Sequence, residues 1–509
     1  MTAGRAVGLL LGSLLLGGGA LGACGTAGAG KGGTGPMAEV PPGRHDAYEL
    51  QDLPRGPIDP ARFPRAPVVP YRPKIGARAW FVAPGGTGDG DAAASPAGDV
   101  RRTVDQAGDG DVVWLKGGAY KVGVPDDEFA LRVHKSVVVS AWPGQRAVLE
   151  PLDDGPTYGI DLQGDGAVLD GLELKGFAQA GIYFGRQKKP QKGAVIARVK
   201  VEGGTDGIRS QVRAGRGKNP LVEGLLVYDV QIRGAAIGFN CGEGPCNDVR
   251  LERVLVDGGE EDARGESHSG ADAVAFEAGD NIAIVDSTVR AVGADGFDLK
   301  ARRVLLLGAQ VRGVGRNGIK LWYGGDLVNC LVYGTGADAA IVFDHGADYR
   351  VVHTTVARHG HRGEAYSLTM AYDHPRQAGR LEIANSIFWD NAGPVWVSGA
   401  TELVVTHSLL SKSKGGTEIV WAKGPDVLVS RYEDAQKKLP GSRGVMIGSD
   451  PRFVDPDKGD FRLRPTSPAV DRGSNLERPP RHDLAGRPRK IGERPDLGPL
   501  EHVPAKEEN

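Results

Sequence analysis

The chain has 509 residues, with 62 basic and 64 acidic side chains and a formal net charge of −2. This even balance indicates neither a basic surface for nucleic acid nor a polybasic patch for a charged membrane, and we expect neither partner. Glycine supplies 78 residues, about twice its usual share. This excess indicates a fold with many tight corners.

The N-terminus has the pattern of an export signal. Arg5 precedes an apolar run that ends at Leu21-Gly22-Ala23-Cys24, and the run is too short for a membrane span but typical of a signal peptide over 1–23. The last four residues resemble the bacterial lipobox. The resemblance implies an exported bacterial lipoprotein, lipidated at Cys24 and held at the outer membrane or cell surface. Ordinary secretion, with Cys24 incidental, is the alternative.

The next stretch, 24–76, is rich in Gly, Pro and Ala without periodicity, and we expect a flexible tether. The fold is predicted over 77–500, with a disordered tail at 501–509. Residues 99–107 read as a short helix that caps the open end of a repeat fold.

Three strips repeat along the chain: ADAVAFE (271–277), ADGFDLK (294–300) and RNGIKLW (316–322). Asp272, Asp295 and Asn317 are 23 and 22 residues apart, as are Ala275, Asp298 and Lys320. A period of 20–30 residues with short apolar strands is typical of a parallel β-helix, in which each repeat is one rung. We therefore predict an all-β solenoid rather than several globular domains.

The repeat extends in both directions, and the Ile or Phe at its third place, counted from Asp272, Asp295 and Asn317 in the three strips, is expected to point into the coil. The further strips are AGIY (180–183), DGIR (206–209), AAIG (235–238), AAIV (339–342) and YSLT (366–369). Strands between them end in Gly, Asn or His, as corners require. An insertion near 257–270 is expected to wall one face; its His268, Glu260, Glu261 and Asp262 read as solvated loop residues.

Both ends of the predicted fold resemble those of secreted right-handed parallel β-helix proteins. The opening is ARAWFVAPGG and the closing segment is GSDPRFVDPDKGDFRLRPTSPAVDRGSN. The resemblance implies a right-handed coil. We expect the protein to be a monomer.

Rungs stack at about 4.8 Å, so residues of one column are neighbours in space. This arithmetic places Asp272, Asp295 and Asp298 together, with Lys320 one rung from Asp298. Three carboxylates beside a lysine on an outer face predict a metal site with a base next to it. Calcium prefers such hard oxygen ligands.

The three strips also resemble motifs of the family nine polysaccharide lyases, the parallel β-helix pectate lyases, which read like ADGFAAK, DDGWDL and GNGFKLGG. The resemblance implies Ca²⁺ bound by Asp272, Asp295 and Asp298, with Lys320 as the Brønsted base of β-elimination on a uronate-containing, acidic polysaccharide. Two positions depart from the family. Ala294 replaces an expected Asp ligand, and Glu277 stands where the family has Lys.

Other residues near the strips are candidates for substrate binding: Asn317, Trp322, Tyr323, Asp344 and Arg350, with His345, Arg209, Arg213 and Arg216 as further possibilities. Each acidic or basic residue taken alone also fits a corner or a salt bridge between rungs. A non-catalytic glycan-binding protein and a glycoside hydrolase using Asp295 and Asp298 are the alternative functions.

The cysteines suggest no zinc site. Cys241 and Cys246 in CGEGPC fit either a small disulfide or a metal, but no second Cys or His pair accompanies them. Cys330 reads as a buried strand residue.

Overall fold

The computed structural model describes Arg62, Pro64 and residues 76–504, apart from short gaps. The gaps are 154, 186–188, 211–221, 243, 259–270, 337, 345, 361–364, 371–378, 399–400, 412, 415, 424–425, 430–440 and 477–478. The predicted signal peptide with Cys24, almost all of the tether, the insertion over 259–270, and Arg213, Arg216 and His345 lie outside the described residues.

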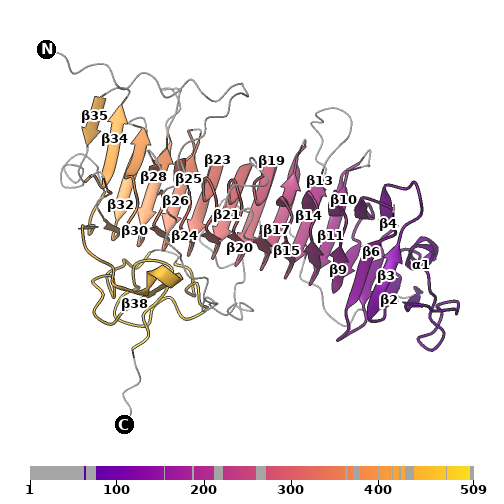
Figure 1. Ribbon diagram of the computed structural model, residues 1–509. Helices are drawn as coiled ribbons and strands as arrows, with labels where there is room; N and C mark the ends of the chain where they lie inside the picture. Colours follow the sequence, from indigo (N-terminus) through magenta and orange to yellow (C-terminus); the bar gives the residue numbers. More distant parts are fainter. Residues whose placement is uncertain are drawn as a thin grey trace, which may run out of the picture.

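The chain winds into one elongated coil of parallel strands, a parallel β-helix, as the repeat predicted (Figure 1). Each turn contributes strands to three columns, and neighbouring strands within a column pair in parallel.

The first column carries the predicted strips. It contains β4 (Phe129–Val133), β7 (Tyr158–Leu162), β10 (Ala180–Phe184), β13 (Asp206–Ser210), β16 (Ile237–Cys241), the first halves of β19 (Val274–Val285), β21 (Phe297–Leu307) and β23 (Ile319–Val328), and then β25 (Asp338–Phe343), β28 (Ala365–Met370), β31 (Val395–Ser398) and β34 (Ile419–Lys423).

The second column follows round a bend. It contains β1 (Ala79–Val82), β2 (Val112–Leu115), β5 (Val138–Ala141), β8 (Val168–Asp170), β11 (Gln191–Ala197), β14 (Val222–Tyr228), β17 (Cys246–Glu252), the second halves of β19, β21 and β23, and then β26 (Asp348–Val352), β29 (Arg380–Ala384) and β32 (Glu402–Thr406).

The third column consists of short strands. It contains β3 (Gly118–Val122), β6 (Ala147–Pro151), β9 (Leu172–Lys175), β12 (Lys200–Glu202), β15 (Gln231–Arg233), β18 (Leu255–Asp257), β20 (Thr288–Arg290), β22 (Gln310–Arg312), β24 (Leu331–Tyr333), β27 (Thr355–Ala357), β30 (Ile387–Trp389), β33 (Leu409–Leu410) and β36 (Met446–Ile447). At the far end of the coil, β35 (Asp426–Val429) pairs antiparallel with β34.

One residue per turn makes the corner between the second and third columns. Ten successive turns place a residue there in the left-handed region, with φ between 41° and 67°: Gly171, Arg198, Asp229, Arg253, Asp286, Gly308, Asn329, His353, Asn385 and His407. Asn and Asp tolerate this conformation better than most residues. Arginine also occupies two of these positions. The corners predicted from the sequence lie after the third column instead, where Gly203, Gly313 and Gly334 take positive φ.

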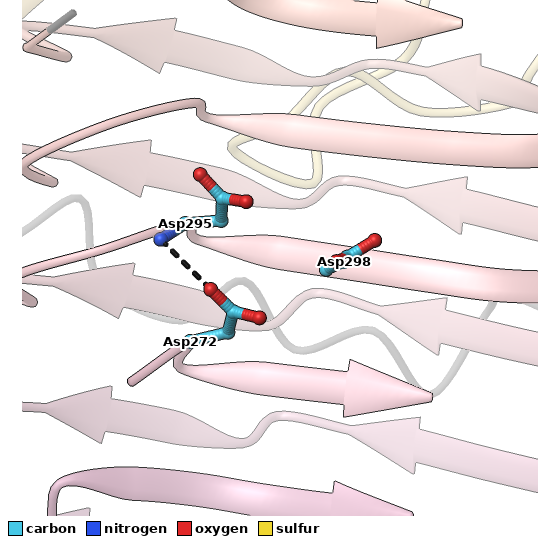
Figure 2. Close-up of side chains that lie close together, drawn as sticks. All are labelled: Asp272, Asp295 and Asp298. Carbon is cyan, nitrogen blue, oxygen red and sulfur yellow. Dashed lines mark hydrogen bonds between the residues drawn. The ribbon is translucent and has the colours of Figure 1, made fainter. Parts of the chain in front are cut away.

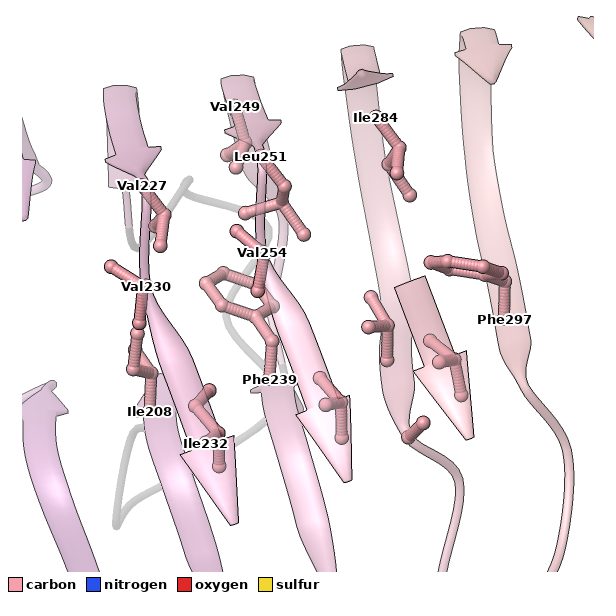
Figure 3. Close-up of a cluster of buried hydrophobic side chains, with 14 of the residues drawn as sticks. Ile208, Val227, Val230, Ile232, Phe239, Val249, Leu251, Val254, Ile284 and Phe297 are labelled. Carbon is pink, nitrogen blue, oxygen red and sulfur yellow. The ribbon is translucent and has the colours of Figure 1, made fainter. Parts of the chain in front are cut away.

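The apolar third residues of the strips line the interior of the coil. Ile208, Phe239, Val274 and Phe297 are aligned on successive strands and buried, and Figure 3 shows several of them within the packed interior. One register was predicted wrongly, because Phe239 rather than Ile237 aligns with Ile208. β15 pairs with β12 and β16 pairs with β13 at the same offset along the chain, so the corner before β16 is no longer than the one before β13, and the strip AAIG was placed two residues too early. The ring of Phe239 stacks on Phe276 at 5.2 Å between centroids.

The predicted helical cap is confirmed. The helix α1 (Val100–Gln106) begins at Asp99, whose side chain accepts a hydrogen bond from the backbone N–H of Arg102. Val100 and Val104 are buried against the first strands of the coil. α1 is the only α-helix in the described part of the chain.

The predicted end of the coil is wrong. The last parallel strand is β36, and the residues beyond it form a separate C-terminal layer with a hairpin of β37 (Phe453–Asp455), the turn η3 (Pro456–Lys458) and β38 (Asp460–Leu463). This layer covers the outer face of the third column (Figure 1). The apolar contacts join Phe453, Phe461, Leu463, Leu484, Leu497 and Leu500 to Leu331, Ala357, Ile387 and Leu409.

The predicted tail also begins too early. Glu501 is 2% exposed and accepts a hydrogen bond from Arg489 at 2.9 Å. Arg489 in turn donates to the side-chain oxygen of Asn329, one of the corner residues between the second and third columns, at 2.6 Å. Outward-facing apolar residues on the third column need a cover, which explains why the chain continues past residue 500 in an ordered form.

Three further observations complete the fold. Arg62 of the predicted tether forms an ion pair with Asp248 at 2.7 Å. Cys241 and Cys246 are joined in a disulfide, and Cys330 is buried, where desolvation raises the pKa of its thiol to about 12. Among the described residues, no helix is long and apolar enough to cross a membrane.

Candidate functional site

The predicted column is confirmed on the outer face of the first column. Ala275, Asp298 and Lys320 are direct register partners on β19, β21 and β23. Successive side chains of a strand point to opposite faces. Since Ile319 and Leu321 are buried in the core, Lys320 between them points outward, as does Asp298 on the preceding rung.

The three predicted carboxylates converge. One carboxylate oxygen from each of Asp272, Asp295 and Asp298 lies within 4.8 Å of the others, and Figure 2 shows the side chains gathered at the start of two adjacent strands. The prediction that they share one small region is confirmed. Asp295 and Asp298 are buried, and Asp272 is partly exposed.

One oxygen of each carboxylate is fixed by an N–H donor. The backbone N–H of Asp295 donates to Asp272 Oδ1 at 3.1 Å. Asp295 Oδ1 accepts from the backbone N–H and the side-chain amide of Asn317 at 2.9 and 2.8 Å. Asp298 Oδ1 accepts from the indole N–H of Trp322 at 2.7 Å. These bonds set the orientation of the carboxylates before any ligand arrives.

The other oxygens of two carboxylates face Lys320. Its ammonium lies 3.0 Å from Asp295 Oδ2 and 3.3 Å from Asp298 Oδ2. The Lys320 side chain is 19% exposed, so it lies at the surface but is largely surrounded. The expectation that Lys320 stands beside the carboxylates and outside the coil is confirmed.

The electrostatics of the cluster favour a neutral Asp272 carboxyl and a charged Lys320. Burial, followed by the charges of Asp295 and Asp298, raises the pKa of Asp272 to about 7. Burial alone lowers the pKa of Lys320, but the charges and hydrogen bonds of Asp295 and Asp298 outweigh it, so this pKa lies above its usual value. A cation shared by the carboxylates would relieve their mutual repulsion.

A second lysine belongs to the cluster and escaped the sequence analysis. The ammonium of Lys300 lies 2.7 and 2.8 Å from the two carboxylate oxygens of Glu277 and 3.7 Å from Asp298 Oδ2. The Trp322 ring is in range of both lysines, with centroid distances of 5.5 Å to Lys300 and 5.6 Å to Lys320. The signal was available, since Lys300 follows Asp298 by two residues and must share its face.

The remaining candidate substrate-binding residues divide into those beside the cluster and those on another part of the coil. Asn317 is buried, and its side-chain oxygen accepts from the backbone N–H of Ala339 at 3.0 Å, so it orients Asp295 rather than facing solvent. Tyr323 follows Trp322 and is 42% exposed. Asp344 comes directly after β25, one rung on, and its backbone N–H donates to Leu321. Direct contacts of these residues with a substrate stay predictions.

Two arginines do not join the cluster. Arg350 lies on β26 in the second column, in ion pairs with Asp326 at 3.5 Å and Glu382 at 3.8 Å. Arg209 lies on β13 and pairs with the buried Asp206 at 3.1 Å. The prediction from chain order placed Arg350 one rung from the site, but the intervening bend turned it onto another face.

The donor set fits a hard divalent cation. Three carboxylates offer anionic oxygens at short mutual distances, and calcium coordinates six to eight oxygens of this kind. One oxygen of each carboxylate already accepts an N–H bond, so further ligands must come from water or a bound anion. Ala294 is fully buried and offers only a backbone oxygen, which accepts from Arg316 N–H at 3.1 Å.

Together, the fold and this cluster define a parallel β-helix with an acidic and basic site on one outer face. No protein family model matches the chain, and no curated protein matches its sequence. Solved structures share the coil. Pectate lyase Pel9A is similar over 84% of this chain and 96% of its own, with 15% identity and a TM-score of 0.44.

Two other solved structures are similar. The A-module of mannuronan C-5 epimerase AlgE4 from Azotobacter vinelandii matches 66% of this chain and 90% of its own, with 14% identity and a TM-score of 0.41. The catalytic unit of a GH87 alpha-1,3-glucanase from Streptomyces thermodiastaticus matches 78% of this chain and 72% of its own, with 12% identity and a TM-score of 0.40. At these identities, the likenesses concern the fold alone.

Proposed function

We propose that this protein is a polysaccharide lyase that cleaves a uronate-containing, pectate-like glycan by β-elimination, with Lys320 as the base. The observation that supports the proposal best is the contact of the outward Lys320 ammonium with two of three clustered aspartates. A structural salt bridge needs one carboxylate. Three converging carboxylates around one lysine cost free energy through repulsion, which is typical of functional sites.

The elimination reaction requires a base and a group that stabilises negative charge. The C5 proton of a uronate is weakly acidic, so a base must stand beside it, and the charge that develops toward the carboxylate must be stabilised. A divalent cation, which we expect to be Ca²⁺, supplies that stabilisation when bound. Asp272, Asp295 and Asp298 would hold it, with their orientation fixed by Asn317 and Trp322.

Lys320 can act as a base only when it is neutral. With Asp295 and Asp298 directed at it, its pKa is raised and it carries a proton. If the charges of these aspartates are satisfied elsewhere, burial is the influence that remains, and burial lowers the pKa of a lysine. Base strength and occupancy of the carboxylates are thus coupled through the same oxygen atoms.

A hydrolase is less well supported. An inverting pair of carboxylates stands about 6.5–9.5 Å apart to admit a water, whereas the oxygens of Asp295 and Asp298 approach within 4.8 Å and both contact Lys320. A retaining pair fits the spacing better, but the lysine would neutralise both members. A glycan-binding protein without turnover remains the second candidate, because Ala294 removes one expected ligand.

Purified protein should be tested on pectate, alginate and glycosaminoglycans, with calcium and with chelator. Lyase activity releases an unsaturated sugar that absorbs in the ultraviolet. Asp298→Asn should lower turnover and its calcium dependence, whereas Asp326→Asn should leave both unchanged, because Asp326 is a buried ion-paired aspartate in the second column.

The alternatives give different results in this assay. New reducing ends without ultraviolet absorbance would indicate a hydrolase. Saturable binding without turnover would indicate a glycan-binding protein. Either result would overturn the lyase proposal.

The setting of this activity is also proposed. An exported lipoprotein anchored at Cys24 would hold the coil outside the inner membrane, where acidic polysaccharides occur. We propose that it acts there as a monomer.

A further inference from the structure

Lys300 has an environment unlike that of Lys320, although both contact Asp298. Lys320 is enclosed by buried aspartates. Lys300 is 28% exposed, and its main partner, Glu277, is 50% exposed. Both lysines approach Asp298 Oδ2, at 3.7 and 3.3 Å. The two ammoniums are therefore at most 7.0 Å apart, the sum of these two distances.

The ion pair of Lys300 with Glu277 is one in which another carboxylate can readily replace Glu277. Exposed ion pairs contribute little to stability, because both charges are well solvated when separated. Glu277 is half exposed and projects from β19, so its carboxylate can leave Lys300 without disturbing the core. Another carboxylate arriving from solvent can then take its place at small cost.

The surroundings of Lys300 suit a sugar acid. The Trp322 ring, 5.5 Å from the ammonium, offers an apolar face next to the charge. Aromatic faces pack against the apolar faces of other groups while their polar edges stay hydrogen-bonded, and the indole N–H of Trp322 is already fixed on Asp298. The exposed Tyr323 follows on the same strand.

We propose that Lys300 recognises a carboxylate of the acidic glycan next to the Lys320 site, and that Glu277 occupies this position in the free protein as a stand-in for the ligand. This inference rests on the proposed function and adds to it a residue that determines specificity. Trp322 supplies an aromatic platform in range of both lysines. The role assigned to Lys300 is charge recognition, and no proton transfer is involved.

The proposal predicts opposite effects for the two members of one ion pair. Lys300→Ala should raise the KM for the acidic glycan about tenfold, the effect of losing one charge-assisted contact. It should leave the KM for the methyl-esterified glycan unchanged. Glu277→Gln should lower the KM for the acidic glycan several-fold, because the competing carboxylate is gone. A purely structural salt bridge predicts that both variants change in the same direction.

A matched pair elsewhere on the coil provides the control. Lys192 and Glu223 form a similar bridge between adjacent strands, with 2.7 Å between Nζ and Oε2. Lys192→Ala should change neither KM nor the preference for the acidic form. Thermal unfolding of each variant shows whether the coil is intact.

The outcomes separate this inference from the proposed function. If wild type cleaves uronans and Lys300→Ala keeps the wild-type preference for the acidic form, the inference is overturned while the lyase proposal stands. A fall in affinity for both Lys300→Ala and Glu277→Gln would likewise overturn it. If wild type neither binds nor cleaves any uronan, both proposals fail together.

Discussion

Removal of the Lys320 ammonium is the most informative single change. At 3.0 and 3.3 Å from two carboxylate oxygens, the ammonium gains about 5 kcal/mol of Coulomb attraction from each at an effective dielectric constant of about 20. Burial of the charges offsets most of this gain, yet removal of one partner from a buried group typically costs about 3–5 kcal/mol. Because Lys320 keeps some exposure, we expect Lys320→Ala to destabilise the cation-free protein by about 3 kcal/mol.

The same change should strengthen calcium binding. The ammonium and a cation compete for Asp295 Oδ2 and Asp298 Oδ2, so Lys320→Ala should lower the calcium Kd by about tenfold or more, since about 1.4 kcal/mol is tenfold. Turnover should be abolished. Lys320→Arg is the matched control, because it keeps the charge and hence the stability but cannot act as a base at neutral pH.

Thermal unfolding with calcium and with chelator measures the change in stability, calorimetric titration measures the calcium affinity, and ultraviolet absorbance of the unsaturated product measures turnover. The destabilisation of Lys320→Ala should appear in chelator and shrink in calcium. If Lys320→Ala alters neither the unfolding midpoint nor the calcium affinity, the lysine is a solvated surface group and our reading of the cluster is wrong.

Three further predictions concern the cluster and the anchor. The pKa of Asp272 is raised from 3.8 to about 7 in the folded state. In chelator, its contribution to the free energy of unfolding should therefore be present below pH 4 and be lost as the pH rises to 7. Asp272→Asn should flatten this pH dependence of stability in unfolding scans between pH 4 and 8. Ala294→Asp should tighten calcium about tenfold and lower the unfolding midpoint in chelator; weaker calcium binding in titration would contradict this. Cys24→Ser should move the protein from the membrane to the soluble fraction, and a detergent-independent soluble wild type would contradict the lipid anchor.

The repeat and the central cluster could be predicted because both follow from spacing. In a parallel coil, residues one repeat apart are neighbours whatever the loops do, which is why Asp298 and Lys320 were correctly paired. Prediction failed where inserted residues and bends interrupted the repeat. The inserted residues before β14 hid the true register of β16, so Ile237 was predicted in place of Phe239, and the bend between β25 and β26 placed Arg350 on another face.

Contacts between side chains were harder to predict than registers. The choice of Glu277 as the partner of Lys300 depends on side-chain reach across an irregularity after Phe276, where β19 carries an extra residue relative to β21. The C-terminal layer depends on contacts between residues far apart in sequence, such as Arg489 and Asn329, and no local periodicity signals such contacts. From the sequence, Cys241 and Cys246 fitted either a disulfide or a metal site, and the structure shows the disulfide.

The C-terminal layer changes how this coil can assemble. In a plain solenoid, each rung contacts only its neighbours, so rungs can form one after another as the chain emerges. Here the bond from Arg489 to Asn329 spans 160 positions, and Leu497 and Leu500 lie over Leu331 and Ile387. A nascent chain that ends before residue 484 would therefore present an uncovered apolar surface on β24 to β33. The third column in this part of the coil can reach its final packing only after the C-terminal segment has been synthesised.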